Sequence, residues 1–229
     1  MTDEDLIPAA TVVLLRDADP GLEVLMLRRN SKIAFGGMWV FPGGAVDDHE
    51  HVTGDSLGSA RVAAVREVEE ETGLTVIGHE LETWSFWIPP QRAEMKVRGK
   101  IRRFSTWFFV TSAPEGDIEV DGGEIHGHQW LTPHEAIAKR DMGEIELVPP
   151  TWVTLHQLGQ HTTVDAALDW AQANEPAEFR TRPIAKDPLT VAWAGDHVYD
   201  GKTSESPKGE GARHRLIMDP AGWVYERTQ

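Results

Sequence analysis

Residues 66–74 read Arg-Glu-Val-Glu-Glu-Glu-Thr-Gly-Leu, and this stretch is the most informative part of the chain. Glu67, Glu70 and Glu71 are spaced i, i+3 and i+4, so they share one face of a helix. Carboxylates at this density repel one another unless a cation lies in front of them, and such oxygen ligands suit Mg²⁺ or Mn²⁺. The stretch therefore predicts a helix that presents a divalent-metal site.

The same helix can be followed to both of its ends. Ser56 or Ser59 is expected to cap its start, and Gly73 is expected to follow its last turn. Glu69 falls on the flank and is expected to be an ordinary solvated charge. A wholly solvated acidic face is the alternative, but acidic residues near a helix C-terminus oppose the helix dipole. The packing face is expected, almost opposite the three glutamates, at Val62, Val65 and Val68.

In their order these residues resemble the Nudix box, Gly-x5-Glu-x7-Arg-Glu-U-x-Glu-Glu-x-Gly-U, in which U is apolar. Residues 66–74 match its second half throughout, and Phe41-Pro42-Gly43-Gly44 matches the usual run into its first half. The resemblance implies a Nudix hydrolase with an α/β (α+β) fold. In that fold a mixed β-sheet is sandwiched between helices.

The first half of the box departs from this pattern. Between Gly44 and Arg66 there are 21 residues, where the box has 13. The glutamate that usually supports the box arginine has no clean counterpart, since Glu50 lies six positions after Gly44 and Gly58 eight before Arg66. The extra residues, around 49–56, are polar and are expected to form an inserted loop.

The residues upstream of the box are similar to those of Nudix coenzyme A diphosphatases, and closest to the branch with a lengthened box that includes a peroxisomal acyl-coenzyme A diphosphatase. The similar runs are Leu27-Arg28-Arg29-Asn30-Ser31 and residues 35–47, in which Phe35 and Trp39 replace a histidine and a valine of that signature. The implied reaction cuts coenzyme A or an acyl-coenzyme A to a phosphopantetheine and adenosine 3′,5′-bisphosphate. Two alternatives stay open: a pyrophosphatase for ADP-ribose, dinucleotides or nucleoside triphosphates, and a Nudix-fold sensor without turnover.

The resemblance also implies roles for the residues of the box. Glu70 and Glu71 would be metal ligands, and Glu67 would be a third ligand or the general base. Arg66 would orient the acidic residues through charged hydrogen bonds. Gly43 and Gly44 let the backbone approach a ligand, and a carbonyl there, at Gly44, would complete the metal site.

Residues outside the box complete the expected site. Glu124, in a late acidic loop, is the candidate for the last metal ligand or general base, with Glu119 and Asp121 as weaker candidates. A basic loop at residues 89–100 can meet phosphates, or it can simply be solubilising charge. The expected substrate-binding residues are Arg28, Arg29, Gly43, Gly44 and Arg92.

Periodicity and turn residues predict the remaining elements. A Nudix domain is expected over residues 1–150, and residues 151–229 are expected to be an extension packed on the same domain, with helices and a β-hairpin region. This extension would cover the substrate site or form a dimer contact. Strands are expected at 9–16, 23–27, 39–42, 75–88, 101–111, 189–193, 215–218 and 223–225. Helices are expected from the Thr132–Glu135 capping box to Arg140, at 151–159 and at 163–173.

The composition limits the setting in which the protein works. Its 229 residues contain no cysteine, which excludes disulfides and thiol catalysis and fits a reducing compartment. A net charge of −15 disfavours duplex nucleic acid as a partner, but it does not exclude a small anionic nucleoside diphosphate derivative. No signal peptide or membrane span is expected, so the predicted location is cytoplasmic. Homodimers are common in the family, so the resemblance implies a homodimer as a possible state of this protein.

Overall fold

The computed structural model describes residues 6–30, 37–90, 95–97, 100–120, 122–200 and 209–228. Within them the chain forms a mixed sheet of nine strands and a second, antiparallel sheet of four strands. None of the helices in this part of the chain is long and apolar enough to cross a membrane.

The large sheet is built around two long neighbouring strands. The first strand, β1 (Leu6–Asp17), runs parallel to β7 (Lys100–Ser112), and it also forms the predicted antiparallel hairpin with β2 (Leu22–Arg29). A mixed sheet is therefore confirmed. The main order is β3-β2-β1-β7-β5-β9, with β3 at Trp39–Val40, β5 at Glu82–Ile88 and β9 at Ala177–Arg180. Off this path, β4 (Gly43–Ala45) pairs with β1, β6 (Met95–Val97) with β7, and β8 (Ile125–Leu131) with β2.

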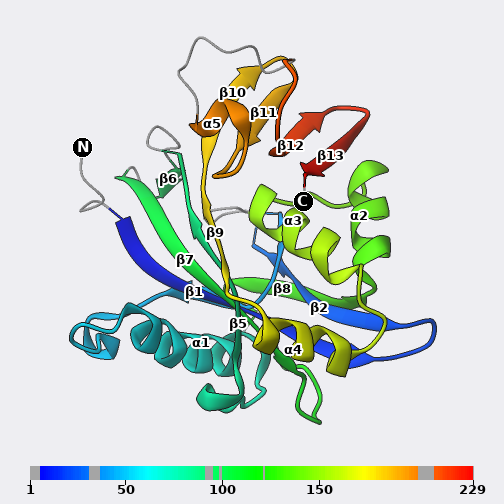
Figure 1. The fold of residues 1–229 in the computed structure, drawn as a ribbon. Coiled ribbons are helices and arrows are strands. Elements are labelled where there is room, and N and C mark those ends of the chain that lie inside the picture. The colour runs from blue at the N-terminus through cyan, green and yellow to red at the C-terminus, as the bar shows by residue number, and fades with distance from the viewer. Residues whose placement is uncertain are drawn as a thin grey trace.

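Helices cover both faces of this sheet, as Figure 1 shows. Alternating side chains of β1 point to opposite faces, so Val12 and Leu14 join one buried cluster while Val13 and Leu15 join the other. Helix α1 (Ser56–Thr72) packs on the first cluster. The second cluster is covered by α2 (Pro133–Asp141), α3 (Pro149–Leu158) and α4 (Val164–Ala173).

Two of the three helix starts predicted after residue 130 are confirmed by their capping geometry. The Thr132 side chain accepts from the Glu135 amide while Glu135 reaches back to the Thr132 amide, which is the predicted capping box of α2. The Thr163 side chain accepts from the Ala166 amide at the start of α4. Helix α3 instead begins at Pro149, two residues before the predicted start, and its N-cap Val148 makes no side-chain hydrogen bond.

The C-terminal part of the chain adds more strands than the sequence predicts. After α4 the strand β9 joins the large sheet beside β5, in parallel. The small sheet then follows in the order β10-β11-β12-β13, with a short helix, α5 (His197–Asp200), after β11. Its strands are β10 (Arg182–Lys186), β11 (Leu189–Ala192), β12 (His214–Asp219) and β13 (Gly222–Arg227).

Aromatic side chains join the small sheet to the large one. Trp87 of β5 stacks on Phe179 of β9 with ring centroids 4.0 Å apart, and Trp193 meets both rings edge-on. On the other side Trp223 of β13 lies against Trp152 of α3. Both sheets therefore share one buried cluster, although the boundary at residue 150 stays a prediction.

Candidate active site

Helix α1 begins one residue earlier than its predicted caps. Asp55 is the N-cap, because its side chain accepts from the Gly58 amide at 2.7 Å. Ser59 instead supports the turn by donating its hydroxyl to the Asp55 carbonyl, so the prediction of Ser56 or Ser59 as the cap is wrong. Gly73 ends the helix as predicted, with φ at 73° and its amide donating to the Glu69 carbonyl.

The predicted packing face of α1 is confirmed at Val68, which is fully buried, and is wrong at Val62. Val62 is 48% exposed, and Val65 is only partly buried. The helix otherwise packs through small side chains, which let it approach β1 and β4 closely, while Glu69 is solvated as predicted. The buried residues of this face are Ala60, Ala63, Ala64, Val68, Glu71 and Thr72. The acidic cluster therefore begins on the packed side of the helix and continues into solvent.

The glycine pair of β4 is required by the glutamates of α1. The Gly43 amide donates to Glu71 Oε2 at 2.9 Å. A Cβ added at Gly43 would lie 2.3 Å from the Ala10 carbonyl oxygen, and one added at Gly44 would lie 2.1 Å from Glu67 Oε1. The contact at Gly43 is with backbone that cannot give way, whereas the contact at Gly44 is with the end of a flexible side chain, so Gly43 has the stricter need for glycine where β4 runs between β1 and the acidic face.

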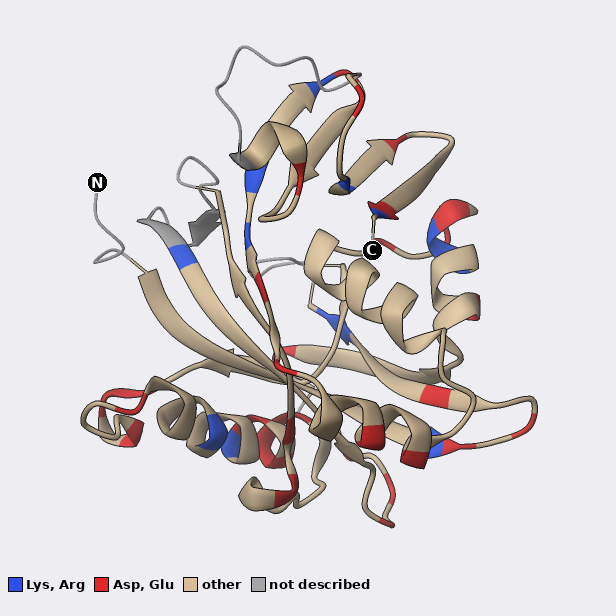
Figure 2. Ribbon diagram, in the orientation of Figure 1, with Lys and Arg blue, Asp and Glu red and all other residues tan. Residues whose placement is uncertain are grey.

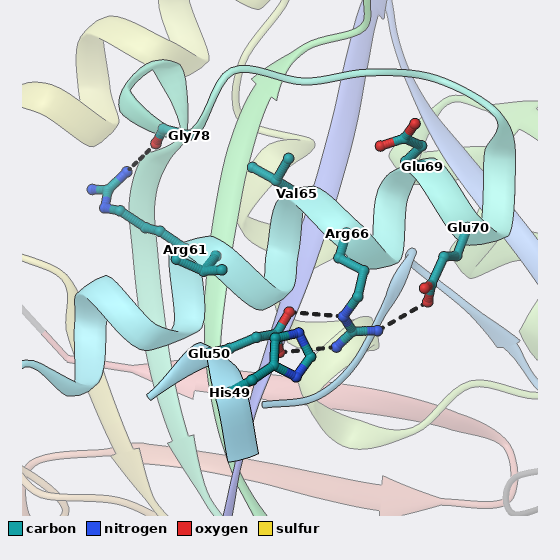
Figure 3. Close-up of a pocket in the computed structure, with 9 residues that line it drawn as sticks. His49, Glu50, Arg61, Val65, Arg66, Glu69, Glu70 and Gly78 are labelled. Carbon is teal, nitrogen blue, oxygen red and sulfur yellow. Dashed lines mark hydrogen bonds and ion pairs between the residues drawn. The ribbon is translucent and has the colours of Figure 1, made fainter. Parts of the chain in front are cut away.

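Arg66 lies at the centre of a network of carboxylates. Its Nη1 atom donates to Glu67 at 2.8 Å and to Glu70 at 2.9 Å, and Nη2 donates to the Ala45 carbonyl at 3.0 Å. Its other edge forms a two-point pair with Glu50, at 2.7 and 3.1 Å. Figure 3 shows the guanidinium between Glu50 and Glu70. Arg66 therefore orients the acidic residues, in the geometry that charged hydrogen bonds favour.

Glu50 is the functional residue that the sequence left unassigned. Its side chain is 2% exposed and accepts from the Asp47 amide as well as from Arg66. Burial raises the pKa of Glu50, but the hydrogen bonds from Arg66 and Asp47 outweigh it and lower the pKa overall. Counted from Gly44, it occupies the glutamate position of the box. The insertion therefore follows Glu50, and the spacing from Gly44 was the signal that could have found it.

Arg29 and Glu124 bring a second ion pair to the acidic face from the sheet. Arg29 Nη2 donates to Glu124 Oε2 at 2.9 Å, which joins the end of β2 to the loop before β8. Since strand side chains alternate, Arg29 lies on the α1 face of the sheet with Leu27, whereas Arg28 is exposed on the opposite face. The side chains of Arg28 and Arg29 therefore lie on opposite faces of the sheet at the end of β2.

Burial and mutual repulsion set the charge of the inner glutamates. Burial raises the pKa of Glu71 to about 8; the Gly43 amide and Arg29 oppose this rise, and Glu67 and Glu124 add to it. Burial also raises the pKa of Glu67, with Arg66 opposing it and Glu70 and Glu124 adding to it. These effects require that Glu67, Glu71 and Glu124 lie close together.

The donor set fits a hard divalent cation. Its carboxylate oxygens, with the carbonyl oxygens of the glycine pair, are the ligand type that Mg²⁺ and Mn²⁺ prefer, and burial together with neighbouring carboxylates raises the pKa of Glu67 and of Glu71. In the arrangement seen here, no three acidic or histidine side chains among the described residues stand close enough to hold an ion. Arg66 draws Glu67 and Glu70 to its own nitrogens, so a cation would compete with Arg66 for both.

The remaining predicted residues are divided between this site and other places. Glu119 lies beyond the end of α1, where its amide donates to the Thr72 carbonyl, and its side chain is exposed. Phe35, Arg92 and Asp121 lie outside the described residues. The residues that the structure brings together are Arg29, Gly43, Gly44, Arg66, Glu67, Glu70, Glu71 and Glu124, with Glu50 added.

A hollow of about 710 Å³ runs along the outer side of α1, next to this network. Arg66 and Glu70 form one end of it, and Arg61 and Gly78 lie at the other (Figure 3). The Arg61 guanidinium is engaged by the carbonyl oxygens of Gly78 and Leu81. The hollow therefore adjoins the acidic site without adding an uncommitted cation to it.

Acidic residues are also prominent on the ribbon around this site, as the colouring of Figure 2 shows along α1 and in the loop before it. This distribution agrees with the net charge of −15 and leaves the two arginines of the site surrounded by carboxylates. An anionic substrate would therefore need cations at the site.

Comparisons with known proteins agree with this geometry. The putative nudix hydrolase 7 of Caenorhabditis elegans is 25% identical over 244 residues, which cover 90% of this chain and 79% of that protein. The human acyl-coenzyme A diphosphatase NUDT19 is 33% identical over 85 residues, which cover 37% of this chain and 21% of that protein. A NUDIX hydrolase from Alicyclobacillus acidocaldarius shares the fold, with a TM-score of 0.62 at 22% identity over 72% of this chain and 96% of that chain.

The model of the NUDIX domain family matches residues 5–150, which contain the glycine pair, Glu50, α1 and Glu124. The match covers more than half of the chain and includes every residue of the acidic site. The protein therefore belongs to the NUDIX domain family, and it is a Nudix hydrolase.

Proposed function

We propose that the protein hydrolyses the diphosphate linkage of a nucleoside diphosphate derivative with the help of Mg²⁺ or Mn²⁺, and that coenzyme A or an acyl-coenzyme A is its substrate. The observation that carries the reaction is the buried group of carboxylates around Gly43 and Gly44, with more negative charge than its two arginines neutralise. Nudix hydrolases generally use divalent metal ions.

Each acidic residue has a distinct part in this proposal. Glu67, Glu70 and Glu71 would hold the cation together with the Gly44 carbonyl, and Arg66 would orient Glu67 and Glu70. A bound cation supplies neutralisation of the phosphoryl charge and a lower pKa for water. Glu124 would take a proton from the attacking water, with Glu67 as the second candidate for that part.

The balanced reaction breaks one bond of the diphosphate. The oxygen of water forms a new bond to one phosphorus, and the bridging P–O bond to that phosphorus breaks. Two phosphate monoesters leave, and the protons of water end on the base and in solvent. From coenzyme A the products would be a phosphopantetheine and adenosine 3′,5′-bisphosphate.

The coenzyme A assignment rests on sequence likeness. The residues around Arg29 and the glycine pair resemble the coenzyme A signature, and part of the chain is similar to a protein named as an acyl-coenzyme A diphosphatase. Cytoplasmic location, a homodimer and substrate contacts of Arg28 and Arg92 stay predictions.

A substrate panel tests the proposal. The purified protein is incubated with Mg²⁺ or Mn²⁺ and with coenzyme A, an acyl-coenzyme A, ADP-ribose or NADH, and the products are identified by mass spectrometry. We expect coenzyme A or its thioester to be cut, and Glu70→Gln to lower kcat by about a hundredfold or more. Glu69→Gln, the exposed neighbour on the same helix, is the matched control and keeps full activity.

The outcomes separate the two parts of the proposal. If ADP-ribose or NADH is cut while coenzyme A compounds are left intact, the substrate is wrong and the diphosphatase stands. If Glu70→Gln retains full activity, the assignment of Glu70 to the metal site is wrong. Binding without turnover of any of the four compounds would make the protein a nucleotide sensor.

A further inference from the structure

Arg29 is the second guanidinium at the acidic face, and it comes from the sheet instead of the helix. Its side chain is 19% exposed, whereas that of its partner Glu124 is 60% exposed. The Arg29 Nε atom is buried and has no hydrogen-bond partner among the described residues. Arg29 is thus largely enclosed by the protein, and it forms an ion pair with Glu124.

Hydrogen bonds from Asn30, next to Arg29, also hold the loop that contains Glu124. The Asn30 amide donates to the Glu124 carbonyl at 2.7 Å, and the Asn30 side chain donates to the Gly123 carbonyl at 2.9 Å. Directly beyond, Arg29 pairs with Ile125 in the β2–β8 ladder. The path of the loop at Glu124 is therefore set by the end of β2, and the Glu124 carboxylate forms an ion pair with Arg29 of the same strand.

Repulsion would otherwise turn that side chain outward. Glu124 raises the pKa of Glu67 and of Glu71, so its carboxylate lies within electrostatic reach of both. Like charges repel, so Glu67 and Glu71 act to push the Glu124 carboxylate outward. The guanidinium of Arg29 opposes this movement, because it also acts favourably on Glu71.

We propose that Arg29 is a positioning residue that holds the Glu124 carboxylate beside Glu67 and Glu71, and that it does not bind the phosphates of the substrate. The inference rests on the proposed function, since it takes Glu124 as a group that acts in hydrolysis. Arg29 would act through Glu124, so its removal should cost kcat and leave KM nearly unchanged.

A double-mutant cycle tests this coupling. The variants are Arg29→Gln, Glu124→Gln and the pair together, with Arg29→Lys as the conservative change. Arg16→Gln is the matched control, since Arg16 forms an exposed ion pair with Glu23 elsewhere in the sheet. We expect each single change to lower kcat by about tenfold with KM within about twofold, and the pair to be within about twofold of either single variant. Arg29→Lys should recover part of kcat.

A second readout does not depend on turnover. Free Mn²⁺ is followed by electron paramagnetic resonance during titration of each variant without substrate. We expect Glu124→Gln to raise the Kd for Mn²⁺ by about threefold or more when Arg29 is present. When Arg29 is already replaced by Gln, the same substitution should raise the Kd by less than half as large a factor. A residue that only supports the fold would not link the two substitutions in this way.

Three results would overturn the proposal. One is a tenfold rise in KM for Arg29→Gln with kcat and Mn²⁺ affinity retained, which is the behaviour of a phosphate-binding arginine. Additive losses in the double variant are another, and an unchanged kcat in Glu124→Gln is the third. If the natural protein cuts none of the panel compounds, the proposed function fails, and the Mn²⁺ titration still decides whether Arg29 and Glu124 are coupled.

Discussion

Two clusters of buried charge within the described part of the chain differ in how completely their carboxylates are paired. In the small sheet, Asp196 is fully buried and accepts from Arg215 at 2.6 Å with each oxygen, and from the amides of His214 and Val198 at 3.0 Å. At the acidic site, five glutamates, including Glu50 and Glu71, surround two arginines.

The same physical effect has opposite outcomes in the two clusters. Burial acts to raise the pKa of both Asp196 and Glu71. At Asp196 the hydrogen bonds from Arg215 and the two amides outweigh burial and lower the pKa, whereas at Glu71 burial and neighbouring carboxylates prevail. A fully paired cluster anchors the fold, while an underpaired one is stabilised when a cation binds. Incomplete pairing of the buried carboxylates therefore identifies the acidic site, whereas burial alone does not distinguish it from the Asp196 cluster.

The largest effect is expected from breaking the paired cluster. Asp196→Asn leaves Arg215 buried, with a side chain that is 4% exposed, and without its counter-charge. Such a change costs about 3–5 kcal/mol of unfolding free energy. Urea unfolding measures this, and kcat/KM per folded molecule should stay within about twofold.

Arg16→Gln is the reference for that experiment. Its ion pair with Glu23 is exposed, so its loss should cost less than about 1 kcal/mol. If Asp196→Asn abolishes hydrolysis at full stability, the C-terminal cluster belongs to the catalytic site and the contrast drawn above is mistaken.

The opposite pattern is expected when the underpaired cluster loses a charge. Glu67→Gln should lower kcat on the order of a hundredfold to a thousandfold, because a carboxylate that holds the cation is gone. Its effect on the metal-free protein should be stabilising, since burial and Glu70 both disfavour the ionised form of Glu67. Thermal unfolding in EDTA checks the sign, and a large drop in melting temperature would contradict it.

Stability of the metal-free protein should also depend on pH through Glu71. The pKa of this group is raised from 4.5 to about 8, so its contribution is fully present below about pH 4.5 and is lost as the pH rises towards 8. Since one pKa unit corresponds to about 1.4 kcal/mol, we expect a loss on the order of 2 kcal/mol after relaxation of the site. Glu71→Gln should remove this part of the pH dependence.

Added Mg²⁺ tests whether this pH dependence comes from a carboxylate that binds the cation. A cation favours the ionised carboxylates, so its stabilising effect should be greater at pH 8 than at pH 5. Unfolding midpoints recorded at both values, with EDTA or Mg²⁺, provide the measurement. An equal effect of Mg²⁺ at both values would speak against binding at Glu71.

The sequence allowed the acidic site to be predicted, but it did not allow the Asp196 cluster to be predicted. The acidic site follows from local spacing: the glutamates of α1 need only helical periodicity, and the strands around them are apolar runs. Asp196 and Arg215 could not be paired from sequence, because the β11–β12 ladder brings together residues far apart in the chain. The additional strands β9 and β10 were missed because prolines at 176 and 183 interrupt their pattern.

The errors at the site itself have a physical reason. Of the valines predicted to form the packing face of α1, Val68 is buried but Val62 is exposed, and the alanines of the helix fill the rest of that face, which only the tertiary contacts with β1 and β4 reveal. Glu50 was left unassigned because the inserted residues lengthen its sequence separation from Arg66. In the folded protein the two side chains are in direct contact. The ion pair of Arg29 with Glu124 joins the end of β2 to the loop before β8, two segments that the sequence alone cannot bring together.

A small effect on stability is expected at Gly44, and it tests whether the acidic site is as mobile as an underpaired cluster should be. A Cβ at Gly44 would meet the carboxylate end of Glu67, which can turn aside. Gly44→Ala should therefore change the unfolding free energy by less than about 1 kcal/mol while lowering kcat by about tenfold. A stopped assay with the preferred substrate and urea unfolding provide the two numbers.

Gly43→Ala is the matched control, because there the added carbon would meet the Ala10 carbonyl of the neighbouring strand, which cannot turn aside. It should cost about 1–3 kcal/mol of stability as the contact between β4 and β1 is forced apart. If Gly44→Ala destabilises the protein as much as Gly43→Ala, Glu67 is held as rigidly as the backbone. The acidic site would then resemble the paired cluster of Asp196, and the need for a cation to organise it would lose its main physical support.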